Sequence, residues 1–87
     1  MIRVQTLVFP FTTAIPAGSG DDQYAAMPGA VIGDVVVATD ASGGVNQLVV
    51  GRVFVSGPNL IGIVMYNGSA GPITPGNMTF HVALIRL

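Results

Sequence analysis

The amino-acid sequence predicts an all-β domain: an antiparallel β-sandwich of jelly-roll-like form, with about six or seven strands and no substantial helix. Turn signals containing Gly, Pro, Asn or Asp recur at short intervals, and the runs between them are rich in Val, Ile, Phe and Thr. Short β-branched runs bounded by turn chemistry are typical of sandwiches and barrels. The chain also has no Lys and no Glu, two good helix formers, and no ten-residue stretch of helical periodicity free of Gly and Pro.

The turn signals divide the chain into six or seven predicted strands. Residues 2–9 and 11–15 are either two strands or one strand bent at Pro10, which lacks the N–H of a central ladder and therefore belongs at an edge or a bulge. Gly51 and Gly62 fall inside strands and predict bulges or close backbone approaches. The other predicted strands cover residues 23–27, 34–39, 47–56, 60–67 and 78–87, and tight turns with positive φ are predicted at Gly43-Gly44 and Asn67-Gly68.

Size and composition bound the possible classes of function. The 87 residues form one domain, 1–87, in which 51% of residues are hydrophobic and 8% are charged, against about 25% charged residues in an average soluble domain. A net charge of −1 gives no electrostatic footprint for nucleic acid. The longest apolar piece, residues 60–66, is too short to span a membrane, and the apolar N-terminus is interpreted as a strand rather than a signal peptide. We therefore expect neither nucleic acid nor a membrane as a partner.

Several predicted strands are apolar on both faces, whereas the strands of an antiparallel sheet with one solvated side alternate between apolar and polar residues. No helix is predicted that could cover a second apolar face, and folded monomers rarely expose an apolar patch beyond roughly a few hundred Å². The sequence therefore predicts an obligate homo-oligomer whose subunits share a hydrophobic core. The clearest case is the strand 60–67, which has Leu60, Gly62, Val64 and Tyr66 on one face and Ile61, Ile63, Met65 and Asn67 on the other.

Few residues in the chain could support catalysis or metal binding. His81 is the single histidine and lies in the middle of a predicted strand, so we interpret it as a strand residue facing solvent or an interface. Asp21 and Asp22 follow a glycine-rich segment but lack the alternating spacing of a calcium loop, and we assign residues 17–22 to an exposed loop tip. Because convergent acid, base and nucleophile groups are missing, we expect no metal, no cofactor and no enzymatic activity.

The three cations of the chain are Arg3, Arg52 and Arg86, and all three fall in predicted strands. A guanidinium group suits partly buried ion pairs, so these residues could pair with Asp side chains across a subunit boundary. They could equally be charges on sheet edges that prevent edge-to-edge aggregation. The sequence leaves both interpretations open.

Two segments of the chain resemble small all-β proteins of tailed-phage virions, among them capsid decoration (cement) proteins and trimeric appendage or fibre modules. The first is Met-Pro-Gly-Ala-Val-Ile-Gly-Asp-Val-Val-Val at 27–37. The second is 64–85, with its Asn67-Gly68-Ser69 turn, its loop at 72–77 and its final apolar strand. The resemblance implies a β-sandwich that trimerises and either clamps capsid subunits or projects from the particle, with no catalytic residues to transfer.

The function expected from this resemblance is that of a phage capsid decoration protein, a homotrimer on the capsid exterior that binds the major capsid protein and stabilises the shell. Segment 1–11 is the candidate for contact with a neighbour or the shell. The alternative is a trimeric fibre or appendage module whose exposed Tyr24 and Tyr66 recognise a host-surface glycan. The residues predicted to contact another subunit or the capsid are Arg3, Phe9, Phe11, Arg52, Phe54, Met65, Tyr66 and Arg86.

Overall fold

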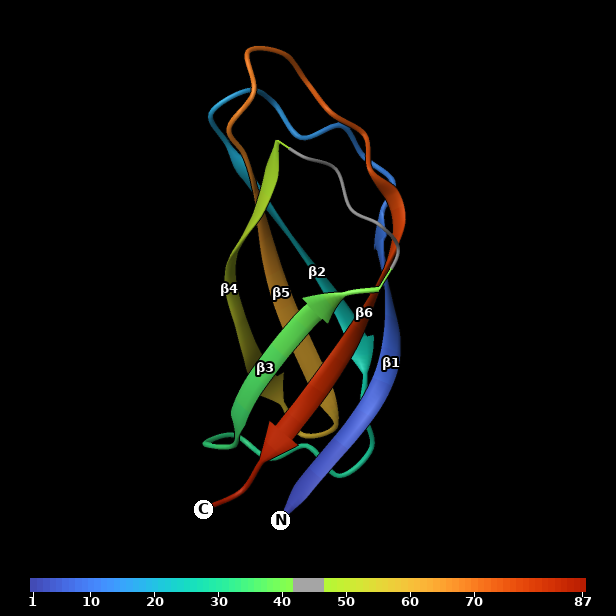
Figure 1. Cartoon of the computed structure of the whole chain (residues 1–87), viewed down its shortest axis with the longest axis vertical. Coiled ribbons are helices and arrows are strands. Elements are labelled where there is room, and N and C mark those ends of the chain that lie inside the picture. The colour runs from blue at the N-terminus through green and yellow to red at the C-terminus, as the bar shows by residue number, and fades with distance from the viewer. Residues whose placement is uncertain (42–46) are drawn as a thin grey trace.

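The computed structural model describes residues 1–41 and 47–87, and these form six β-strands in two three-stranded antiparallel sheets (Figure 1). The sheets have the orders β1-β6-β3 and β2-β5-β4, and no helix occurs in the described residues. The all-β sandwich is therefore confirmed. The strands are β1 (Ile2–Phe11), β2 (Gly20–Ala26), β3 (Val35–Asp40), β4 (Leu48–Gly57), β5 (Leu60–Asn67) and β6 (Gly76–Ile85).

The strand pairing is nested, which gives the sandwich its jelly-roll-like form. The first strand pairs with the last, β1 with β6, and the second pairs with the fifth, β2 with β5. The two middle strands, β3 and β4, then occupy edges of different sheets and contact each other across the sandwich. Because the outermost strands of the sequence pair with each other, both termini lie at the same end of the molecule (Figure 1).

The N-terminal part of the chain forms one strand rather than two. The β1–β6 register continues without interruption from Ile2 opposite Ile85 to Phe11 opposite Gly76, and Pro10 takes its place in it opposite Asn77. Pro10 is tolerated because β1 is an edge strand, as the sequence predicted. The predicted strand at 11–15 is wrong: the chain leaves the sheet after Phe11, and Ile15 makes only an isolated bridge with Ile73.

Two further boundaries differ from the sequence prediction. Strand β2 begins at Gly20, so Asp21 and Asp22 lie in a strand and not in a loop tip. Strand β6 ends at Ile85, so Arg86 lies beyond the strand in which it was predicted. The predicted turn at Gly43-Gly44 lies outside the described residues.

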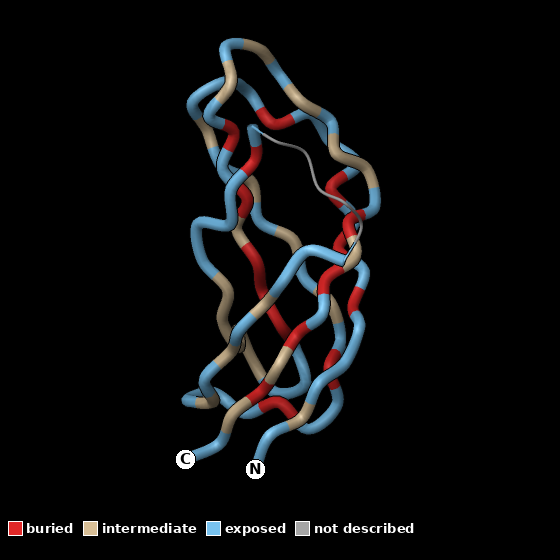
Figure 2. Tube along the Cα trace, in the orientation of Figure 1, coloured by how far each residue is buried: buried red, intermediate tan, exposed pale blue. Residues whose placement is uncertain are grey.

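Inward-facing side chains of both sheets fill one hydrophobic core (Figure 2). At its centre the rings of Phe9 and Phe80 meet edge to face with centroids 5.7 Å apart. Phe9 and Phe11 are fully buried and Met65 is 3% exposed, so these three residues are core residues of the single chain. This corrects their assignment to a contact surface, because their side chains offer almost nothing for a partner to touch. The other buried hydrophobic residues are Leu7, Ile15, Met27, Ala30, Leu48, Ile61, Ile63, Met78, Phe80, Val82 and Leu84.

Asn67 is the buried polar residue of this core, and it does not form the predicted tight turn. Neither Asn67 nor Gly68 has a positive φ, and the next strand begins only at Gly76. The Asn67 amide instead donates from Nδ2 to the carbonyl oxygens of Ile15 (2.8 Å) and Gly71 (2.9 Å) and accepts a bond from the Ser69 N–H (2.9 Å). The side chain therefore ties together two loops at the end of the sandwich opposite the termini.

Both strand glycines occupy the special positions that the sequence predicted. Gly51 lies at a β-bulge, where the β4–β5 register shifts between Val50 and Arg52. Gly62 is covered by the ring of Phe54 from the neighbouring strand, and a Cβ at Gly62 would lie 2.6 Å from Phe54 Cζ. The absence of a side chain at position 62 is therefore what allows the tip of the ring to approach the strand so closely.

Replacing Gly62 with Ala is expected to destabilise the fold, because the new methyl group would overlap the Phe54 ring. Overpacking of this kind typically costs about 1–3 kcal/mol. Gly57→Ala in β4 is the matched control, since a Cβ there meets no atom within 4 Å. Urea unfolding at one fixed protein concentration gives the comparison. Equal stabilities of the two variants would contradict the prediction, and Phe54→Ala should remove most of the penalty in the Gly62→Ala background.

Candidate functional site

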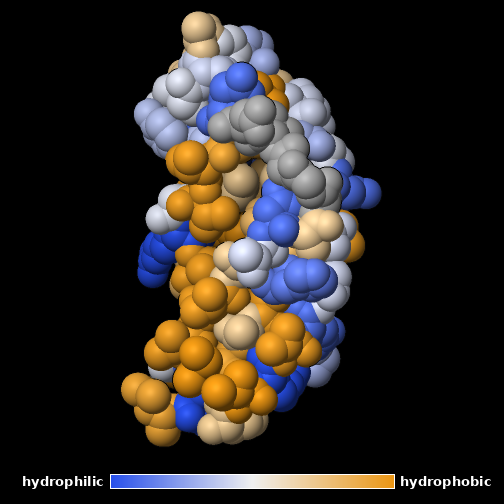
Figure 3. Space-filling view, in the orientation of Figure 1, coloured by the Kyte–Doolittle hydropathy of each residue, from blue (hydrophilic) through white to orange (hydrophobic). Residues whose placement is uncertain are grey.

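The outward side of sheet β1-β6-β3 carries two apolar rows at the end where the termini lie. The six residues of these rows are Ile2, Ile85, Val35, Val4, Ala83 and Val37, and we call them the apolar face. Ile2 is 71% exposed and Val4 is 68% exposed, which is far more than an aliphatic side chain in a core. The hydrophobic band in Figure 3 covers this part of the molecule. The register places Ile2, Ile85 and Val35 in the first row and Val4, Ala83 and Val37 in the second.

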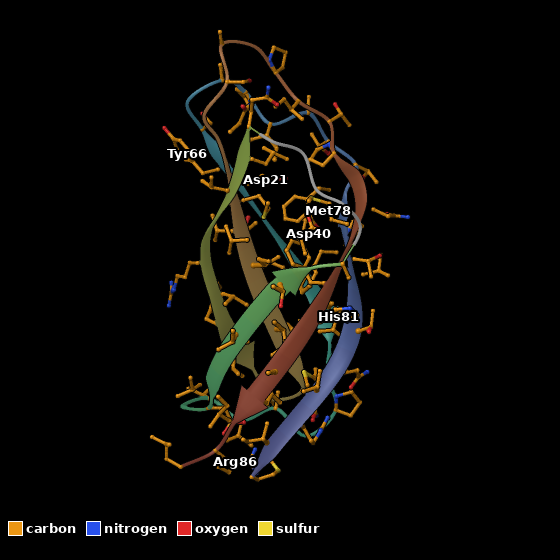
Figure 4. The ribbon with its side chains drawn as sticks, in the orientation of Figure 1. Asp21, Asp40, Tyr66, Met78, His81 and Arg86 are labelled. Atoms are coloured by element: carbon orange, nitrogen blue, oxygen red, sulfur yellow. The ribbon has the colours of Figure 1, made fainter. Side chains whose placement is uncertain are left out.

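A polar row borders the apolar face farther along the same sheet. The β1–β6–β3 register aligns Thr6, His81 and Thr39, and His81 points outward from the central strand (Figure 4). The Thr6 hydroxyl lies 3.0 Å from Nδ1 of His81. His81 is exposed, so the structure places it on a surface, as the sequence predicted.

The outward side of sheet β2-β5-β4 has a different chemistry, and we call its residues Asp22, Tyr24, Arg52, Phe54 and Tyr66 the tyrosine face. The Tyr24 hydroxyl donates to the Asp22 carboxylate at 2.5 Å, and this bond, with the nearby negative charge, raises the pKa of Tyr24 above its usual value. The Arg52 guanidinium lies over the Phe54 ring, 4.2 Å from its centroid. Tyr24 and Tyr66 are each about two-fifths exposed, at 42% and 44%.

Two arginines and one aspartate join the termini to the loop between β2 and β3. Arg86 donates from Nε and Nη2 to the two carboxylate oxygens of Asp34, at 2.9 and 2.8 Å, and also bonds the Gly29 carbonyl oxygen. Arg3 donates to the Pro28 carbonyl oxygen of the same loop. The Arg86 guanidinium and the Val31 N–H lower the pKa of Asp34 from 3.8 to about 2. Arg86 therefore pairs with an aspartate of its own chain, which corrects the suggestion that it pairs across a subunit boundary.

The remaining predicted contact residues lie in two separate places. Arg52, Phe54 and Tyr66 share the tyrosine face, whereas Arg3 and Arg86 hold the β2–β3 loop beside the termini. The prediction missed the apolar face, although the alternation of residues in the sequence already grouped Val35 with Val37 and Ala83 with Ile85. The sequence alone did not show that these residues point outward.

Within residues 1–41 and 47–87, no three His, Cys, Asp or Glu side chains come together as a possible metal site. The same ranges contain no helix with the length and hydropathy needed to span a bilayer.

Comparison of the chain with protein-family models, with curated proteins and with solved structures gives no match.

The Asp34–Arg86 pair predicts a loss of stability in acid. Because the pKa of Asp34 is lower in the folded chain (about 2) than its usual value of 3.8, which it regains in the unfolded chain, its contribution is complete above about pH 4 and is lost as the pH falls towards 2. Asp34→Asn should reduce the fall in melting temperature between pH 5 and pH 2 relative to the unmodified chain. Asp21→Asn, which removes a carboxylate from the other sheet, is the control. If both variants show the same acid dependence as the unmodified chain, the pair has no such role.

Proposed function

We propose that the chain is a structural subunit of a phage particle: a capsid decoration protein that forms a homotrimer and binds the major capsid protein on the capsid exterior. The observation that supports this proposal is the apolar face, which stays in water although the core beneath it is already filled by buried side chains of both sheets. A surface of this kind is typical of a protein that functions in an assembly.

The two outward faces suit two different contacts. The apolar face is suited to contact with copies of the chain, while the tyrosine face carries the Tyr, Phe and Arg side chains that are enriched at protein–protein interfaces. Binding of such an oligomer to the assembled shell, and not to its dissociated subunits, would stabilise the shell by mass action. No bond needs to be made or broken in this function, so it requires no convergent catalytic groups.

Particles assembled without this protein are expected to release their DNA at a lower temperature, or under a smaller osmotic shock, than particles that carry it. Adding the purified protein back to such particles should restore the higher release temperature, because binding to the intact shell is reversible in this mechanism. The measurement is DNA-dye fluorescence during a temperature ramp. Identical release temperatures with and without the protein would refute the decoration function.

The tyrosine face also favours the second candidate, a module that recognises a host-surface glycan. Tyr24 and Tyr66 project from the same side of one sheet, and Asp22 adds a hydrogen-bonding carboxylate beside Tyr24. Aromatic rings can pack against the C–H faces of sugars while carboxylates bind their hydroxyl groups.

The glycan candidate predicts that a variant combining Tyr24→Ala and Tyr66→Ala loses adsorption of particles to cells while the heads keep their thermal stability. Val8→Thr, on the opposite sheet, is the control and should leave adsorption unchanged. The measurement is the fraction of particles that remains unbound after mixing with cells. Unchanged adsorption of the double variant would exclude this candidate.

A further inference from the structure

The total exposed surface of the molecule is ordinary for its mass. What is unusual is where its exposed aliphatic side chains lie. The chain exposes 4655 Å², close to the roughly 4,800 Å² expected for a folded monomer of this mass. The sandwich is therefore as compact as an ordinary domain. Most of its exposed aliphatic side chains nevertheless gather on one side of one sheet and in the loop and chain ends next to it (Figure 3), whereas Val49, Val50 and Leu60 belong to the other sheet.

The exposed residues of the apolar face, together with the exposed aliphatic residues of the adjoining loop and chain ends, have the size that a stable protein interface needs. A buried aliphatic side chain removes roughly 100 Å² from water, so the exposed fractions of the eight residues concerned correspond to roughly 500 Å². Homodimer interfaces are about 65% apolar, and 500 Å² of apolar surface then belongs to an interface of roughly 800 Å² per partner, the standard size. The eight residues are Met1, Ile2, Val4, Val31, Ile32, Val35, Val37 and Leu87.

The charges of the face fit a second copy of the same chain. In a contact between copies that buries this face, any carboxylate or guanidinium on the face would have to leave water, which is costly for an unpaired charge. None of the outward-facing residues of β1, β6 and β3 is Asp or Arg, and His81 is the one titratable side chain among them. The arginines at this end are instead directed to the loop, where they bond Pro28, Gly29 and Asp34.

The relief of the face also suits sheet-on-sheet packing. On the central strand β6, the large Ile85 stands two residues from the small Ala83, which is flanked by Val4 and Val37 in its own row. The surface of the sheet is therefore lower at Ala83, the centre of the second row, than at Ile85, the centre of the first row. Two faces with this relief can interdigitate in the way that the inner faces of a β-sandwich do.

We propose that copies of this chain associate with each other through the apolar face, with the outward side of sheet β1-β6-β3 buried between subunits. This inference deepens the homo-oligomer of the proposed function by naming the sheet and the residues that form the contact. The tyrosine face then remains free for a different partner.

Sedimentation velocity of the full chain from 1 to 100 µM tests the proposal. The unmodified chain is expected to sediment as a multiple of 8.9 kDa, and Val4→Glu or Val37→Glu should weaken association at least 100-fold, because each would bury an unpaired charge. Val49→Glu is the matched control, since Val49 is exposed to a similar degree (55%) but lies opposite Tyr66 on the other sheet. A monomeric unmodified chain at 100 µM would overturn the proposal, as would folded Glu variants that associate as tightly as the unmodified chain.

Two measurements keep the test decisive if a Glu variant fails to fold. Val4→Thr and Val37→Thr keep the β-branched shape, and each should weaken association about tenfold. In the unmodified chain, methyl NMR signals of Val4, Val37 and Ile85 should shift with dilution while that of Val49 stays constant. Shifts confined to Val49 would overturn the proposal.

The outcome is also separable from that of the proposed decoration function. If the apolar face mediates association but particles without the protein release DNA at the usual temperature, only the decoration function fails. If particles lose stability without the protein but the apolar-face variants remain fully associated, only the present inference fails.

Discussion

The register between β1 and β6 is the constraint on which the rest of the structure depends. Ten consecutive residues of β1 pair with ten of β6 in one unbroken ladder. Since side chains alternate along a strand, this single alignment brings Phe9 and Phe80 together in the core and leaves Ile2 and Val4 beside Ile85 and Ala83 on the outside. A slip of one residue would exchange the two sets. The interior and the apolar face are therefore fixed by the same hydrogen bonds.

The nesting of the strands extends this constraint to both sheets. Once the two ends of the chain pair, β2 and β5 pair in the second sheet, and β3 and β4 take the remaining edges. The chain ends need additional contacts because the first and last residues of a domain fray easily. Arg86 and Arg3 provide such contacts through hydrogen bonds to the β2–β3 loop, and Met1 and Arg86 exchange backbone hydrogen bonds at the same end.

The two outward faces differ because their side chains are held in different ways. On the tyrosine face, Arg52 packs on Phe54 and Phe54 packs on Gly62, so the larger side chains are already supported within the chain. On the apolar face, the side chains are short and aliphatic, and water is their neighbour in the single chain. Only a second surface can remove them from water, which is why the proposed assembly begins on this face.

The sequence by itself determined the fold class, the edge position of Pro10 and the special roles of Gly51 and Gly62, because each follows from local chemistry: strand propensity, a missing N–H and a missing side chain. It also showed that several strands have two apolar sides. Only the tertiary structure decided which side is interior, and it placed Phe9, Phe11 and Met65 inside and Val4 and Val37 outside. The alternation of side chains along a strand separates its two faces, but it does not show which face is interior when both are apolar. For the same reason the pairing of Arg86 with Asp34, 52 residues apart, and the burial of Asn67 between two loops could not be predicted, since both depend on which distant segments the strand pairing brings together.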